Sequence, residues 1–261
     1  MEIIYFIIAL VSSLIGAISG IGGGIIIKPV MDSISVMSIS TISFLSGCTV
    51  LTMTITSLIR NKKSEARVKI NYGITAYLAI GSALGGVIGN ILFDFIKNNI
   101  FSEDIIIIIQ SLILLIINII IIIYMKNKSR IKTLDINNKW ICSLIGLTLG
   151  IISSFLGIGG GPLNIAVLYY FLSMNAKEST INSLFIIFFS QVTSLGTTLL
   201  SWDIPKFKLI FLVLMCCGGV IGALAGSKIA KNMNNSKTEK FFMGVLFMLI
   251  FINIFNIIKC I

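Results

Sequence analysis

The sequence has 261 residues, of which 56% are hydrophobic and 11% are charged, and its mean hydropathy is +1.04. A soluble domain of this length cannot bury so much apolar surface, so the composition excludes one and predicts an all-α polytopic membrane protein. The net charge of +10 would suggest nucleic-acid binding in a soluble protein. Here the basic residues lie in short loops between apolar segments, which indicates topology determinants and no nucleic-acid partner.

Apolar segments recur from Ile3 to Ile258, so we expect the lipid bilayer to surround the protein along its whole sequence. The longer segments are predicted as helices over about residues 3–19, 42–59, 72–93, 105–125, 140–156, 179–200, 207–229 and 241–258. Two shorter arms follow the first and fifth of these segments, at about residues 25–37 and 162–173. The isoleucine-rich segment at 105–125 is typical of a lipid-facing scaffold helix.

A glycine motif interrupts the chain twice. Gly20–Gly24 reads GIGGG, and the same five letters return at Gly157–Gly161. A glycine inside a helix costs roughly 0.5–1 kcal/mol relative to alanine, so such a run should open the helix. Pro29 follows the first copy and Pro162 touches the second, each without a backbone donor. Each copy therefore predicts a broken membrane helix whose free N–H groups face a small anion.

The two motifs belong to an internal repeat. Their first residues, Gly20 and Gly157, are 137 residues apart, and Ser46 has Ser183 at the same offset. Further on, the sequence GGVIG occurs both at 85–89 and at 218–222, within ridges of small residues that let membrane helices approach closely. The predicted units are a first membrane repeat (1–125), a basic cytoplasmic linker (126–139) and a second membrane repeat (140–261).

The distribution of charge predicts how the repeats are oriented. If each glycine break is the tip of a re-entrant pair, each half crosses the membrane three more times and the halves have inverted topology. With the N-terminus outside, the loops 60–69, 126–139 and 228–240 face the cytoplasm and hold fourteen of the twenty lysines and arginines. The alternative, eight simple spans with the N-terminus inside, would place the loop 228–240 outside, against the positive-inside rule.

A candidate solute site follows from this geometry. The glycine tips should meet near the midplane, and Lys28 would add a positive charge for a small oxyanion. Alternatively, Lys28 extends to the surface or pairs with Asp32. Hydroxyls and amides beside the tips can replace an anion's hydration shell, or instead bond neighbouring helices. The predicted substrate-binding residues are Gly20, Gly22, Gly23, Gly24, Lys28, Ser46, Gly157, Gly159, Gly160, Gly161, Asn164, Asn182, Ser183 and Gln191.

Catalytic chemistry has little support in the sequence. There is no histidine, the five cysteines form no CxxC pair, and no carboxylate falls in the middle of an apolar segment. We therefore expect no enzyme activity, no cofactor and no metal.

With its two glycine motifs, followed by Pro29 and Pro162, and about four apolar segments in each half, the chain resembles the TauE/SafE family of sulfite-exporter-like permeases. The resemblance covers nearly the whole chain. It implies transport of small sulfur-containing anions, such as sulfite or organosulfonates, across a bacterial inner membrane. The first motif departs from the second because no proline directly follows its glycines.

The leading hypothesis is therefore a secondary transporter of a small sulfur-containing anion, working by alternating access around the paired glycine breaks. A transporter of another small anion, such as a carboxylate, is an alternative. A membrane scaffold subunit without a solute pathway is a third. Smooth apolar surfaces are also compatible with a homodimer.

Overall fold

The computed structural model describes residues 2–34, 37–65, 67–99, 102–158, 160–202 and 204–260. Over these residues the regular structure is helical throughout. The helices are α1 (Glu2–Ser19), α2 (Gly24–Ile34), α3 (Ile39–Lys62), α4 (Tyr72–Asn99), α5 (Glu103–Asn127), the 3₁₀ turn η1 (Lys128–Arg130), α6 (Lys139–Phe155), α7 (Gly161–Leu172), α8 (Ala176–Leu200), α9 (Leu209–Asn232) and α10 (Asn235–Cys260). The prediction of an all-α polytopic membrane protein is confirmed.

Helix length separates two groups of helices. Seven of them in the described part are long and apolar enough to cross a bilayer: α1, α3, α4, α5, α8, α9 and α10. By contrast, α2 has 11 residues and α7 has 12. At 1.5 Å per residue these short helices reach roughly 16–18 Å, about half of a hydrocarbon core of ~30 Å. They are the two arms that the sequence predicts after the glycine motifs.

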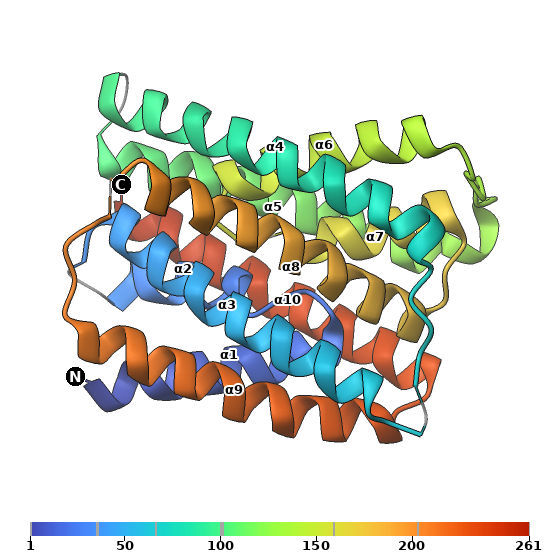
Figure 1. Cartoon of the computed structure of the whole chain (residues 1–261). Helices are drawn as coiled ribbons and strands as arrows, with labels where there is room; N and C mark the ends of the chain where they lie inside the picture. Colours follow the sequence, from blue (N-terminus) through green and yellow to red (C-terminus); the bar gives the residue numbers. More distant parts are fainter. Residues whose placement is uncertain are drawn as a thin grey trace.

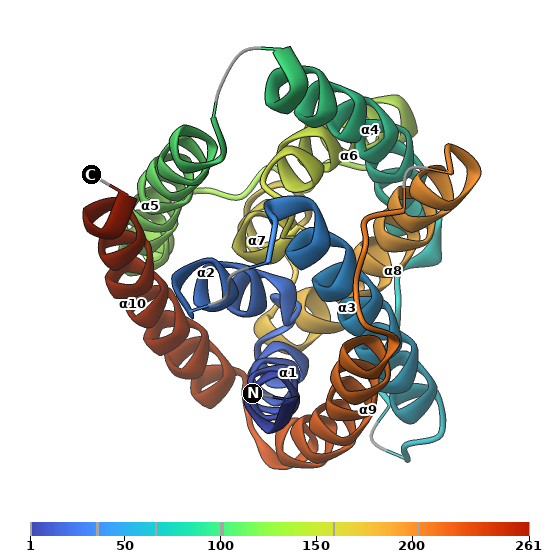
Figure 2. The same cartoon turned by 90° about the vertical axis from the view of Figure 1, so that its left-hand side faces the viewer.

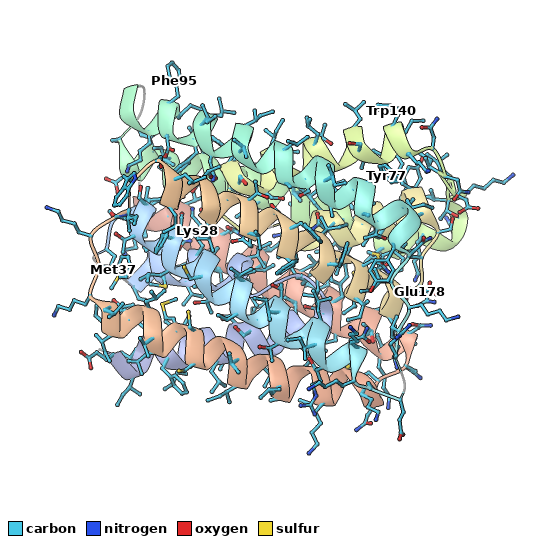
Figure 3. The ribbon with its side chains drawn as sticks, in the orientation of Figure 1. Lys28, Met37, Tyr77, Phe95, Trp140 and Glu178 are labelled. Atoms are coloured by element: carbon cyan, nitrogen blue, oxygen red, sulfur yellow. The ribbon has the colours of Figure 1, made fainter. Side chains whose placement is uncertain are left out.

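Both broken pairs turn back inside the bundle. The N-terminus, marked in Figure 1, lies at the same end of the molecule as Met37, which follows α2 and is labelled in Figure 3. Trp140 at the start of α6 and Glu178 at the start of α8 lie at the opposite end. The pair α1–α2 therefore enters and leaves at one end, and α6–α7 enters and leaves at the other. Figure 2, seen along the helices, places α2 and α7 towards the centre, with longer helices around them.

Helix packing is reciprocal between the halves. Helix α4 packs along α6 and α9 packs along α1, so each half holds the broken pair of the other half (Figure 1). The glycine ridges make this contact. A Cβ atom on Gly85 would clash with the carbonyl oxygen of Leu147 on α6, and one on Gly222 would clash with that of Leu10 on α1. The small residues thus bring helix backbones into direct contact, as the sequence predicts.

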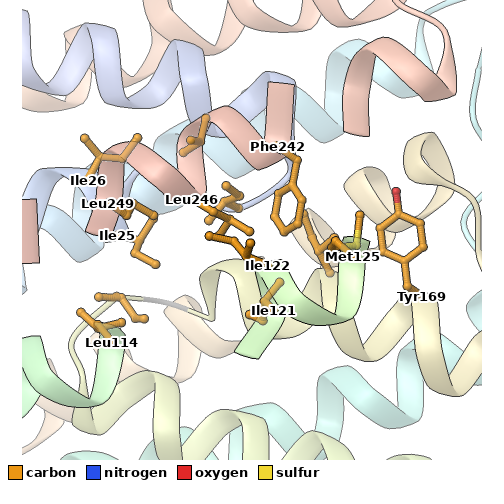
Figure 4. Packing of buried hydrophobic residues seen from close by; sticks show 14 of the residues in the cluster. Ile25, Ile26, Leu114, Ile121, Ile122, Met125, Tyr169, Phe242, Leu246 and Leu249 are labelled. Carbon is orange, nitrogen blue, oxygen red and sulfur yellow. The ribbon is translucent and has the colours of Figure 1, made fainter. Parts of the chain in front are cut away.

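The outer helices α5 and α10 close the bundle over the arms. Ile25 and Ile26 of α2 pack with Leu114 and Ile122 of α5 and with Leu246 of α10 (Figure 4). The interpretation of 105–125 as a lipid-facing scaffold is therefore wrong for one face of α5. Its polar residues are buried as well: Gln110, Ser111 and Asn118. They point into the protein because lipid offers polar groups no hydrogen-bond partner.

Several helices are longer than their apolar segments. Helix α4 continues to Asn99, beyond the expected end at residue 93, and α3 begins at Ile39 and ends at Lys62. Hydropathy marks only the part of a helix that lies in hydrocarbon. Polar and charged residues at the membrane surface continue the helix because water there can solvate their side chains.

Candidate functional site

The two glycine tips meet in the interior. Gly20, Gly22 and Gly157 have positive φ angles of 76°, 85° and 66°, a conformation that residues with a side chain rarely adopt. A Cβ atom on Gly24 would lie 2.8 Å from the carbonyl oxygen of Ile158, and one on Gly161 would lie 3.0 Å from Ile25 Cδ1. The glycines therefore turn the chain and also let one tip approach the other.

The first tip is tied to α8. The Ser183 hydroxyl donates a 2.7 Å hydrogen bond to the carbonyl oxygen of Gly20. A Cβ atom on Gly20 would lie only 2.5 Å from Thr180 Cα, so α8 runs directly against the turn. Ser183 thus satisfies a backbone acceptor that the broken helix leaves free. Its equivalent in the first half, Ser46, is also buried, and no hydrogen bond from its hydroxyl is found among the described residues.

Lys28 lies against the second tip. It is 2% exposed, and its Nζ donates to Gln110 Oε1 on α5. The Asp32 carboxylate lies 3.7 Å from the same nitrogen, one turn along α2. A Cβ atom on Gly157 would lie 2.8 Å from Lys28 Cε, so the lysine stem runs beside the glycine. The pairing with Asp32 is found, and Lys28 does not extend to the surface.

A polar cavity of about 570 Å³ leads to this tip from the end of the molecule that holds Met37. We call it the Ser201 cavity. Gly157 and Gln191 line it, together with nine serine and threonine side chains from α3, α6, α8 and their flanks. At its mouth Lys97 Nζ donates a 2.6 Å hydrogen bond to Ser40 Oγ. The lining offers hydroxyl donors and ammonium groups that can replace the water around an anion.

A second cavity of about 580 Å³ opens at the opposite end and is called the Ser64 cavity. Its lining includes four cationic side chains, those of Arg60, Lys63, Lys177 and Lys231. It reaches the first tip through Thr180, the residue against which Gly20 packs.

The 137-residue offset of the glycine motifs relates the two cavities. Fourteen residues that line the Ser201 cavity have a counterpart at this offset among the residues that line the Ser64 cavity. Among these pairs are Ser40 with Lys177, Ser43 with Thr180, Ser194 with Ser57, and Ser201 with Ser64. Each cavity thus uses equivalent surfaces of the two halves, and each ends at a glycine tip.

The other predicted site residues have separate positions. Asn164 is buried beside Gly160, and its Oδ1 has no hydrogen-bond partner among the described residues. Asn182 accepts hydrogen bonds from Asn71 N and Thr75 Oγ1, so its amide oxygen fastens the start of α4 and is not bonded to a glycine tip. Gly23 packs against the backbone of α1. Gly159 lies outside the described residues.

Sequence reasoning missed Gln110, Ser43 and the hydroxyl lining of the Ser201 cavity. Gln110 Nε2 donates a 2.6 Å hydrogen bond to the carbonyl of Phe155 at the end of α6, so this amide links α5, α2 and the second break. A signal was present in the sequence. Gln110, Ser111 and Asn118 fall on one face of an otherwise isoleucine-rich helix, because Ser111 and Asn118 are seven positions and so about two turns apart, and Gln110 is next to Ser111.

Comparison with known proteins gives two matches. The family model described as sulfite exporter TauE/SafE matches residues 5–253. The chain is 25% identical over 268 residues to the probable membrane transporter protein YunE of Bacillus subtilis (strain 168), which covers 95% of each chain. No solved structure matches.

Proposed function

The chain belongs to the sulfite exporter TauE/SafE family, and on this premise we propose that it carries small sulfur-containing oxyanions by alternating access. The family consists of membrane transporters and not of enzymes, so this chain is a multi-pass transporter of a small solute in a bacterial membrane. We propose in addition that the solute is a small sulfur oxyanion, that it binds at the glycine tips, and that the two sides of the membrane gain access to it alternately.

The pair of cavities carries the proposal. One opens at each end of the bundle, each ends at a glycine tip, and the tips contact one another between them. A transporter that exposes one central site alternately to each side needs this arrangement. A scaffold subunit gains nothing from two broken helices and two polar cavities, since non-helical backbone at that depth must line a cavity or be buried.

The two halves, residues 1–125 and 140–261, act in this proposal as inverted repeats joined by a cytoplasmic linker. The opposite directions of α1–α2 and α6–α7 support it, and so does the reciprocal packing of α4 on α6 and α9 on α1. Rocking one half against the other would then connect the central tips with one cavity while it closes the other.

Electrostatics favours an anion as the solute. The Ser64 cavity lies at the end with the basic loops, which the positive-inside rule assigns to the cytoplasm. Its cationic lining raises the local concentration of anions. Each negative charge that leaves a cell with a negative interior gains about 2.3 kcal/mol per 100 mV, so export of a monoanion needs no coupling ion.

Uptake into proteoliposomes tests the proposal. Sulfite, thiosulfate, sulfoacetate and acetate are compared for the wild type, Lys28→Ala and a matched control, Lys259→Ala. Lys259 donates to the carbonyl of Ser33 at the exposed end of α10. We expect saturable flux of sulfur oxyanions that is lost in Lys28→Ala and kept in the control.

Two other results would reject the proposal. Flux of acetate alone would identify a carboxylate carrier. No flux of any anion by demonstrably folded protein would favour a scaffold subunit.

The homodimer stays a prediction from the apolar outer surface.

A further inference from the structure

The buried ion pair on α2 has no structural counterpart in the second half. Lys28 and Asp32 are 3% and 5% exposed at their side chains and lie one helical turn apart. The 137-residue offset places Ile165 and Tyr169 at the same points of α7. An arm of this fold therefore packs well without the pair. Burying two charges in a membrane protein rarely stabilises it, so the pair points to a functional role.

The geometry of the pair leaves the lysine incompletely satisfied. Its nitrogen lies 3.7 Å from Asp32 Oδ2, whereas a charge-assisted hydrogen bond is about 2.7–2.9 Å long. The neutral amide of Gln110 accepts from the same nitrogen, and Phe155 holds that amide in place. An ammonium group has three donors, so Lys28 can still bind a further acceptor.

Lys28 lies beside two residues that line the Ser201 cavity. Gly157 and Ser43 both line this cavity, and both lie at the point where the lysine stem passes. The Ser43 hydroxyl is buried without a hydrogen-bond partner in the described structure. An oxyanion at the bottom of the cavity would meet this hydroxyl first and the lysine next.

We propose that Asp32 is an internal competitor of the transported anion: it neutralises Lys28 while the site is empty, and the entering oxyanion displaces it. The inference rests on the proposed function, since it assumes that an anion reaches the second tip. Lys28 then has a counter-charge in the empty as well as the loaded state, so the unloaded transporter never holds an unpaired cation in its interior. The affinity for the solute is then set by the difference between two free energies, that of the solute bound to Lys28 Nζ and that of the Asp32 carboxylate bound to the same nitrogen.

Binding of thiosulfate and sulfite to purified protein in detergent, measured by titration calorimetry, tests the competition. Asp32→Asn keeps the shape of the side chain and removes its charge. We expect it to bind the anions about tenfold more tightly than the wild type, a gain of ~1.4 kcal/mol. The matched control is Glu239→Gln, which removes the carboxylate from the ion pair with Lys128 near the opposite end. It should leave the dissociation constant within about twofold of the wild type, since neither Glu239 nor Lys128 lines the Ser201 cavity.

A neutral double variant guards against loss of folding. Lys28→Gln with Asp32→Asn removes both charges and leaves no buried ion unpaired, so it should fold and elute as the wild type while binding neither anion. If the wild type binds the anions and Asp32→Asn binds them equally or more weakly, the competitor role is wrong and the proposed function stands. If the double variant binds as the wild type does, Lys28 has no part in the site. If no variant binds either anion, both proposals fail.

Discussion

Substituting alanine for Gly20 or for Gly157 tests whether the two tips share one backbone conformation and differ in the atoms packed against them. Both glycines have positive φ, 76° and 66°, so both substitutions force a side chain into the left-handed region. That strain costs roughly 1–2 kcal/mol in either case. The difference between the variants comes from what the new methyl group meets.

At Gly20 the methyl carbon would lie 2.5 Å from Thr180 Cα, which belongs to the backbone of α8. The backbone of a helix cannot move away as a side chain can, so overpacking adds a cost of roughly 1–3 kcal/mol to the strain. We expect the free energy of unfolding to fall by about 2–5 kcal/mol in total. At Gly157 the nearest atom is Lys28 Cε, at 2.8 Å, in a side chain that can move. Gly157→Ala should therefore lose only about the backbone strain, ~1–2 kcal/mol, and should move the lysine.

Equilibrium unfolding in mixed micelles of a mild detergent and dodecyl sulfate measures the free energies. Gly196→Ala is the matched control, because Gly196 lies in α8 and a Cβ atom there would have no neighbour within 4 Å. Alanine at this helical position should stabilise the protein by roughly 0.5–1 kcal/mol. The expected order of stability is Gly196→Ala, wild type, Gly157→Ala, Gly20→Ala. Equal stability of the two tip variants, or either tip variant as stable as Gly196→Ala, would refute the packing described here.

Three further tests concern the helix contacts, the first glycine tip and the two cavities. Gly85→Ala and Gly222→Ala should each destabilise the protein by roughly 1–3 kcal/mol in the same micelle titration, because both add a methyl group where two helix backbones touch; a neutral result at either position would contradict the reciprocal packing. Ser183→Ala removes the hydrogen bond to the Gly20 carbonyl and should cost about 1–3 kcal/mol, since a buried acceptor is left unpaired; Ser183→Thr, which keeps the hydroxyl, is its control. In a background without native cysteines, Ser64→Cys should react with a membrane-impermeant maleimide only from the cytoplasmic side and Ser201→Cys only from outside; labelling of both from one side would exclude opposite-facing cavities.

Local backbone chemistry made the helix breaks predictable from the sequence. Three glycines in a row disfavour a helix more than the glycine pairs that α4 and α9 contain, so Gly20–Gly24 and Gly157–Gly161 identified both turns and both short arms. The small-residue ridges likewise predicted close helix contacts. The partner of each ridge was not predictable, because a glycine permits close approach by any helix and does not select one.

The contacts of polar side chains were harder to predict. Asn182 lies in α8 one residue before Ser183, yet its amide bonds the start of α4 while the serine bonds a glycine tip. Adjacent residues on a helix point about 100° apart, and only the tertiary arrangement decides what each one meets. Gln110 was missed because the prediction used the mean hydropathy of the segment and not the face on which its polar residues lie.

The exchange of partners between the halves has a consequence for the integrity of the chain. Helix α4 packs along α6, and α9 packs along α1, so the helix that covers the glycine ridge of each half belongs to the other half. A protein cut in the segment between η1 and α6 should therefore regain its structure when its two pieces are produced together. In a piece produced alone, the glycine ridge would face lipid without its partner helix.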